Sequence, residues 1–172
     1  GLASDIELLD DYPSHYAVYA GRQHRWVRGD WQLLPWLLPW VPSRDGRRAN
    51  DLPLIGRWKL FDNLRRSLVP AASTALLCLG WTLLEPARFW TVAVVGLIAL
   101  PAMIGWATEL VGKASDQYWA AHLRTTLRSG GRRIAQLAFT LACLPFESYV
   151  TLDAIVRTTL RTVFTRRGLL QW

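Results

Sequence analysis

The chain has 172 residues, a formal net charge of +7 and ten tryptophans, and 51% of its residues are hydrophobic. This tryptophan content argues against an ordinary soluble domain, because the indole ring collects at membrane–water interfaces where its N–H stays wet. All basic residues except Lys59 and Lys113 are arginine. A basic excess fits anionic lipid head groups, diphosphates or nucleic acid, so the charge alone leaves the anionic partner open.

Residues 1–41 open with an acidic segment that alternates with apolar residues, which predicts a short strand and a loop closing at Tyr12 and Pro13. The chain begins at Gly1 and ends on an apolar stretch, and we expect it to be part of a longer polypeptide. The carboxylates of the acidic segment are Asp5, Glu7, Asp10 and Asp11. They are interpreted either as the edge of an active-site floor or as a solvated loop.

A helix is predicted to follow this segment. Ser14 is a suitable N-cap, and we expect the helix to reach Val27 or Arg28 and to end at Gly29. Asp30 can then cap a tryptophan-rich segment over residues 31–38. Prolines interrupt this segment, and it is too short to span a membrane, so we predict that it is interfacial.

Residues 42–66 combine a polar loop with a basic helix. The loop, residues 42–53, is rich in proline, glycine, asparagine and aspartate, which is typical of turns. In the helix predicted for residues 54–66, Trp58, Phe61 and Leu64 recur at a spacing of three among arginines. This pattern predicts an amphipathic helix in the head-group plane, and a surface helix of a soluble domain is the alternative.

Residues 67–108 contain two uncharged runs, of 18 residues before Glu85 and 20 residues after Arg88. At helical rise these runs reach roughly 27 and 30 Å, which is about the thickness of a hydrocarbon core. Their short separation predicts a transmembrane helical hairpin, with Pro86 starting the second helix. A pair of buried helices in a large soluble core is the alternative.

Residues 109–172 are predicted to form a cytoplasmic basic region. Arginines and lysines flank the hairpin on both sides, whereas its turn carries only Arg88, so both ends of the chain should be cytoplasmic. A third apolar run, residues 134–152, contains Gln136, Pro145 and Glu147 and has arginines before and after it. We therefore interpret it as re-entrant or interfacial rather than as a third span.

The pattern R-x-x-R-W at Arg22, Arg25 and Trp26 is the main candidate for chemistry. Helical spacing places these three residues on one face, with Gly29 leaving room beside them. Forked arginine donors match phosphate oxygens and can stabilise a leaving diphosphate, while an indole face can stack on a sugar ring. The pattern is weak by itself, since most such pentads are solvated helix faces. His15, His24 and His122 show no metal-site spacing.

In its order of acidic segment, R-x-x-R-W, interfacial helix and membrane hairpin, the chain resembles processive, membrane-bound family-2-like glycosyltransferases such as cellulose synthases. The strings SDIELLDDYP at residues 4–13, HRWVRGDWQLLPW at 24–36 and RWKLFDNLRRSLVP at 57–70 are similar to the cyclic β-1,2-glucan synthases of Gram-negative bacteria. So are LPFE at residues 144–147 and TRRGLLQW at 165–172. The resemblance covers nearly the whole chain.

This resemblance implies that the chain contributes to elongation of a β-1,2-glucan from UDP-glucose in the bacterial inner membrane. It assigns Arg22, Arg25 and Trp26 to the diphosphate and the acceptor, and Asp30 and Trp31 to the same pocket. Many relatives have glutamine where this chain has Arg22, which leaves the role of that position open. The donor site with its divalent cation and the catalytic base are expected upstream, so this segment should hold no cofactor or metal and be inactive alone.

The sequence thus predicts a mainly α, multi-pass membrane fragment, with a short strand and loop left over from an α/β glycosyltransferase domain. Its expected partners are UDP-glucose, the growing glucan, the lipid bilayer and the rest of the same polypeptide. A non-catalytic membrane anchor or scaffold that uses its arginines only to bind lipid is the alternative. Nucleic-acid binding fits poorly, because two bilayer-length runs divide the basic residues.

Overall fold

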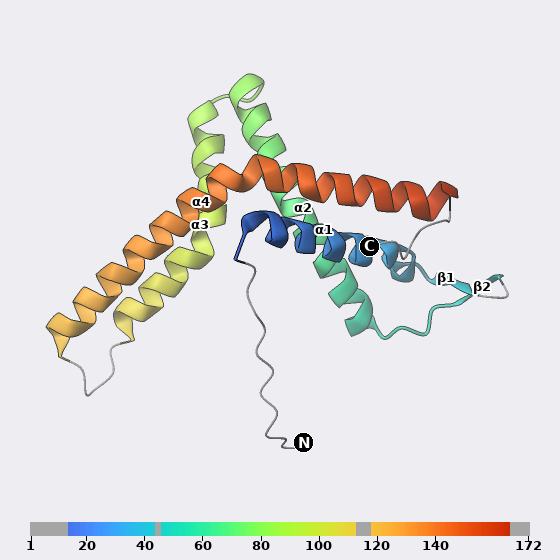
Figure 1. Cartoon of the computed structure of the whole chain (residues 1–172), viewed down its shortest axis with the longest axis horizontal. Helices are drawn as coiled ribbons and strands as arrows, with labels where there is room; N and C mark the ends of the chain where they lie inside the picture. The colour runs from blue at the N-terminus through green and yellow to red at the C-terminus, as the bar shows by residue number, and fades with distance from the viewer. Residues whose placement is uncertain (1–13, 44–45, 113–117, 166–172) are drawn as a thin grey trace, which may run out of the picture. The chain divides into compact units, whose positions relative to one another are not determined.

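The computed structural model describes residues 14–43, 46–112 and 118–165, and this part of the chain is mostly helical, as predicted (Figure 1). Its α-helices are α1 Tyr16–Gln32, α2 Leu54–Thr82, α3 Ala87–Val111 and α4 Trp119–Leu160. A 3-10 helix, Leu34–Leu37, and the strands β1 Trp40–Ser43 and β2 Gly46–Ala49 lie between α1 and α2, and a π-helical turn, Arg161–Thr165, follows α4. The chain divides into two units, residues 1–64 with 153–172, and residues 65–152.

Helix α1 of the first unit is longer than the sequence predicts. It continues through Gly29 to Gln32, so the predicted end at Gly29 is wrong. The N-cap is His15 rather than Ser14, and its carbonyl accepts the first amides of the helix. A glycine inside a helix costs only about 1 kcal/mol. Here the residues beyond it are held in the helix by Trp31, which packs against a buried cluster.

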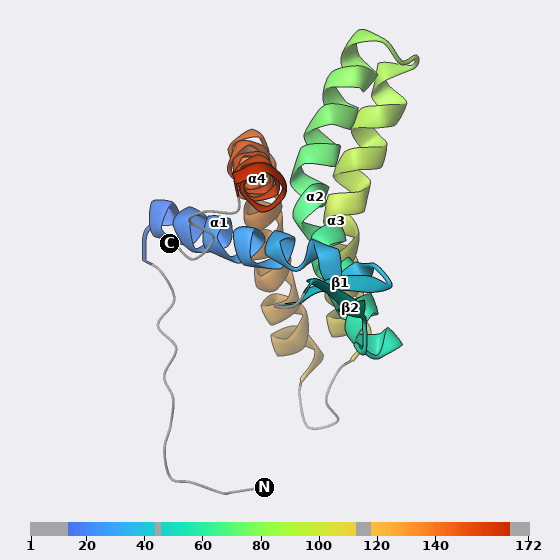
Figure 2. The ribbon, with the colours of Figure 1, turned by 90° about the vertical axis from the view of Figure 1, so that its right-hand side faces the viewer.

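An antiparallel hairpin of β1 and β2 overlaps the loop predicted for residues 42–53 (Figure 2). In this hairpin Trp40 is opposite Ala49, and Ser43 is opposite Gly46. Gly46 has a φ of 120°, a conformation that side chains with a Cβ rarely adopt. The turn-rich composition of residues 42–53 agrees with a hairpin, but its two short strands were not predicted. The strand predicted within residues 1–12 lies outside the described residues.

Asn50 ties this hairpin to the 3-10 helix. Its side-chain amide donates to the carbonyls of Trp36, at 2.7 Å, and Leu38, at 2.9 Å. Its side-chain oxygen accepts the amide of Leu52 at 3.0 Å. The Arg57 guanidinium at the start of α2 donates to the carbonyl of Leu37. Side-chain hydrogen bonds thus connect the hairpin, the 3-10 helix and the start of α2.

The second unit contains the predicted helical hairpin, in which α2 and α3 run side by side (Figures 1 and 2). The turn between them ends at Pro86, which is the N-cap of α3, as the sequence predicts. The basic helix predicted for residues 54–66 and the first apolar run form one continuous helix, α2. Trp90 of α3 packs directly on Gly80 of α2, where the Cβ of any larger residue would lie 2.6 Å from the Trp90 Cβ.

Gly80→Ala is therefore expected to destabilise the hairpin by about 1–3 kcal/mol, because the added carbon overpacks the contact with Trp90. Gly96→Ala on α3 is the matched control, since nothing lies within 4 Å of its added carbon. Reversible unfolding of the full-length protein in detergent measures both changes. Equal stability of the two variants would contradict the tight contact between α2 and α3.

Among the described residues, α3 and the helix Trp119–Val163 are long and apolar enough to cross a membrane. Only 11% of the most apolar window of α3 is buried, so side chains such as Val92 and Leu97 face outward. Helix α2 is not one of these two helices. Its first half contains arginines, and it ends two residues before the end of the uncharged run that precedes Glu85. Residues 134–152 lie inside the uninterrupted α4, and their re-entrant or interfacial position stays a prediction.

Candidate functional site

The predicted R-x-x-R-W residues lie on one face of α1. The guanidinium carbon of Arg22 is 4.6 Å from the ring centroid of Trp26, which is a cation–π contact. Arg25 is exposed, and Trp26 retains 54% of its accessible surface. These residues therefore form a cationic and aromatic surface, here called the Arg–Trp face, that is open to a ligand.

The opposite face of α1 packs against the C-terminal end of α4, which belongs to the same unit (Figure 1). Val27 is 2% exposed and forms a cluster with Ala154 and Ile155, and Trp31 packs against this cluster. Burial of a valine side chain contributes about 1.5–3 kcal/mol. The cluster therefore fixes the rotation of α1 and directs the Arg–Trp face away from α4.

An ion pair adds to this contact. His24 Nε2 lies 3.0 Å from Asp153 Oδ2, and Arg157 Nε donates to Asp153 Oδ1 at 2.7 Å. An ionised carboxylate only accepts hydrogen bonds, so His24 Nε2 must carry the donated hydrogen. Burial raises the pKa of Asp153 and the bonds from Arg157 and His24 lower it by more, so the pKa lies below its usual value. Asp153 is therefore ionised at neutral pH and accepts both hydrogen bonds, and its contribution to stability is lost as the pH falls through that lowered value.

Asp30 and Trp31, the two further pocket residues predicted from the resemblance, have different surroundings. Burial raises the pKa of Asp30, and a hydrogen bond with Asn63 of α2 partly offsets this rise. Asp30 follows Trp26 by one helical turn, so it stands beside the Arg–Trp face. Trp31 packs on the opposite, buried side of α1. In this structure Trp31 supports the helix, and its place in a pocket stays a prediction.

The described part of the chain contains no group of three or more histidine, cysteine, aspartate or glutamate side chains that could hold a metal ion. The carboxylates Asp5, Glu7, Asp10 and Asp11 lie outside the described residues. What the site offers chemically is therefore fixed positive charge next to an aromatic surface.

The sequence did not reveal Asp153 as a partner of His24. Asp153 and Arg157 have the i, i+4 spacing of an ordinary pair on a helix surface, which carries no information about a distant helix. The separation of 129 residues between His24 and Asp153 leaves no local signal. The charge of Asp153 within an arginine-rich tail was the one available indication.

The chain is 36% identical over 99% of its length to the cyclic β-(1,2)-glucan synthase NdvB of Rhizobium meliloti (strain 1021). It spans about 6% of the length of that relative. No family model matches the chain, and no solved structure matches it. The matched region covers all the described elements. Over 99% of its length the chain is thus similar to one segment of a cyclic β-(1,2)-glucan synthase, which supports its assignment to that family.

Proposed function

We propose that this chain is part of a membrane-bound glucosyltransferase that elongates a β-1,2-glucan from UDP-glucose. In this proposal the segment supplies contacts to the diphosphate and the acceptor and attaches the enzyme to the membrane. The similarity to a cyclic β-(1,2)-glucan synthase supports the reaction class. One observation carries the role of the segment. The Arg–Trp face is exposed, while the opposite face of α1 packs against α4.

The Arg–Trp face suits a glycosyl transfer because negative charge develops on the diphosphate as the glycosidic bond breaks. Arg25 is exposed and has forked donors for the phosphate oxygens. The Arg22 guanidinium lies over the Trp26 ring and can contact the same diphosphate from its edge. One face of the indole is thereby covered, and the other is left for the acceptor sugar.

The remaining chemistry belongs outside this segment. The divalent cation of the donor site and the general base that activates the acceptor hydroxyl are proposed to lie in preceding residues of the full-length protein. The Arg–Trp face then stabilises the leaving group, which in enzymes accelerates a reaction by about 10²–10³-fold per well-placed donor. The segment alone is accordingly proposed to be inactive.

Membranes that contain the full-length protein test the reaction. With labelled UDP-glucose they should form a soluble glucan in which linkage analysis finds 1,2-bonds, whereas labelled GDP-glucose should give no product. Chelation of divalent cations should abolish incorporation. Product formation from GDP-glucose alone, or a different linkage, would refute the proposed donor or product.

Contacts within the first unit bear on the membrane topology. His24 is paired with Asp153, so these two residues lie on the same side of any membrane. The chain between them must cross an even number of times, and two crossings can come from α2 with α3 or from α3 with α4. The second choice would export the arginines that follow residue 118, against the positive-inside rule. We therefore propose that α2 and α3 cross, that residues 134–152 are interfacial, and that both ends are cytoplasmic.

Cysteine labelling in spheroplasts tests this topology. In the full-length protein with every cysteine, including Cys78 and Cys143, replaced by serine, Glu85→Cys should react with a membrane-impermeant maleimide from the outside. Arg128→Cys should react only after the membrane is permeabilised. The reverse pattern would mean that α3 and α4 are the crossing pair.

A further inference from the structure

Two glycines let the helices α3 and α4 approach closely in the second unit. The indole of Trp106 on α3 lies against Gly130 of α4, and its Nε1 donates to the Thr126 carbonyl at 3.0 Å. Conversely, the guanidinium of Arg133 on α4 lies against Gly105 of α3, where an added Cβ would be 3.0 Å from Nη1. Small residues at such contacts are typical of helices that pack in membranes. The two glycines thus place an indole and a guanidinium side by side.

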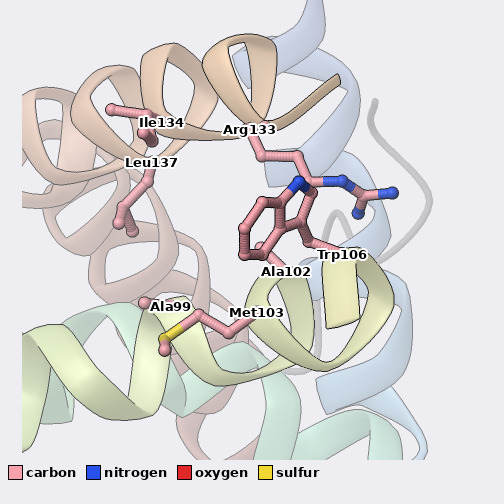
Figure 3. Close-up of a pocket in the computed structure, with 8 residues that line it drawn as sticks. Ala99, Ala102, Met103, Trp106, Arg133, Ile134 and Leu137 are labelled. Carbon is pink, nitrogen blue, oxygen red and sulfur yellow. The ribbon is translucent and has the colours of Figure 1, made fainter. Parts of the chain in front are cut away.

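An apolar pocket of about 240 Å³ begins next to this pair (Figure 3). Apart from the Trp106 and Arg133 end, alanine, methionine, isoleucine and leucine side chains of both helices line it. Met103 and Ile134 are 61% and 71% exposed, so the pocket opens to the outside of the helix pair. Its shape and lining suit a hydrocarbon chain, with one polar end.

The polar end carries unused positive charge. Arg133 Nη2 donates to Glu109 Oε2 at 3.0 Å, whereas its Nε is buried and has no hydrogen-bond partner among the described residues. Residues 105–112 and 118–137 contain four arginines and one carboxylate, a formal charge of +3. The arginines are Arg124, Arg128, Arg132 and Arg133. This surplus complements an anionic group bound at the mouth of the pocket.

We propose that this pocket binds an anionic phospholipid of the cytoplasmic leaflet, with one acyl chain between α3 and α4 and the phosphodiester on Arg133. The inference rests on the proposed membrane attachment. An indole and a guanidinium at one level mark the head-group plane, because both side chains favour that interface. The apolar part of the pocket then lies at acyl-chain depth.

Photolabelling of the full-length protein in phosphatidylcholine vesicles tests the proposal. A trace of phosphatidylglycerol with a diazirine in its acyl chain should label peptides within residues 99–106 and 130–137. The same diazirine on phosphatidylcholine should label them less. Arg133→Gln should lower the phosphatidylglycerol labelling about fivefold, the value of one cation near a membrane surface. Glu109→Gln, which releases Arg133 from its ion pair, should raise it.

Arg132→Gln is the matched control for the loss of one charge and should lower the labelling less than Arg133→Gln, because Arg132 is exposed and does not line the pocket. Ala102→Phe, which fills the pocket, should remove labelling from both helices. Equal labelling by the two lipids, or labelling unaffected by Arg133→Gln and Ala102→Phe, overturns the lipid site. Protein that is extracted by alkaline carbonate overturns the membrane attachment as well, which separates failure of the site from failure of the proposed function.

Discussion

Arg25→Ala in the full-length protein is expected to lower glucose transfer from UDP-glucose by about 10²-fold or more, the usual effect of removing one charge that stabilises a transition state. The decrease should appear in kcat, because the charge on the leaving diphosphate develops only as the bond breaks. Trp26→Ala should also reduce transfer, mainly through a higher KM for the acceptor glucan. Initial rates at varied donor and acceptor concentrations separate the two effects.

Both residues are exposed, so their loss should leave the fold and the membrane insertion unchanged. Ala17→Ser is the control on the same helix, since Ala17 is exposed and helical spacing places it away from the Arg–Trp face. Arg25→Lys keeps the charge, loses the fork and should retain part of the activity. Normal transfer by Arg25→Ala and Trp26→Ala would remove the catalytic role and favour the alternative of a membrane anchor with lipid-binding arginines.

Helices α1, α2 and α3 could be predicted from the sequence because their signals are local, whereas the long helix α4 was not predicted. Charge-free runs and a three-residue spacing of aromatic side chains indicated α2 and α3, and Pro86 marked the start of α3. The ends of the elements were harder to predict. Gly29 has the local signature of a helix end, but packing of Trp31 against the cluster around Val27 extends α1 past it. The β-hairpin was hidden because its strands are short and hydrogen bonds from Asn50 support it.

For the candidate site, helical spacing was enough to place Arg22 and Trp26 together, and their cation–π contact agrees with that spacing. The residues of α4 that contact the opposite face of α1 could not be predicted from the sequence. Asp153 and Ala154 follow the apolar run at residues 134–152, which was interpreted only as a membrane-associated segment. No periodicity in the sequence relates these two residues to α1. The direction in which the Arg–Trp face points is thus a tertiary property, set by residues more than a hundred positions away.

His24→Ala is expected to loosen α1 by about 1.5–3 kcal/mol, the range for a hydrogen bond to a charged group, because it leaves Asp153 without this partner. Asp153→Ala should have a similar effect. The double variant should be little worse than either single one, because the two residues form one interaction. Hydrogen exchange of the amides in residues 16–32 measures the change, and about tenfold faster exchange corresponds to about 1.4 kcal/mol.

Arg157→Ala separates this effect from a general loss of charge on α4. Arg157 bonds the same carboxylate, but it is 59% exposed and lies on α4 itself, so its loss should cost at most about 0.5 kcal/mol. If His24→Ala accelerates exchange in α1 and also lowers glucose transfer, while Arg157→Ala does neither, the ion pair acts by positioning the Arg–Trp face. Additive effects of His24→Ala and Asp153→Ala would instead show that the two side chains act independently. The buried cluster around Val27 would then be sufficient to orient α1.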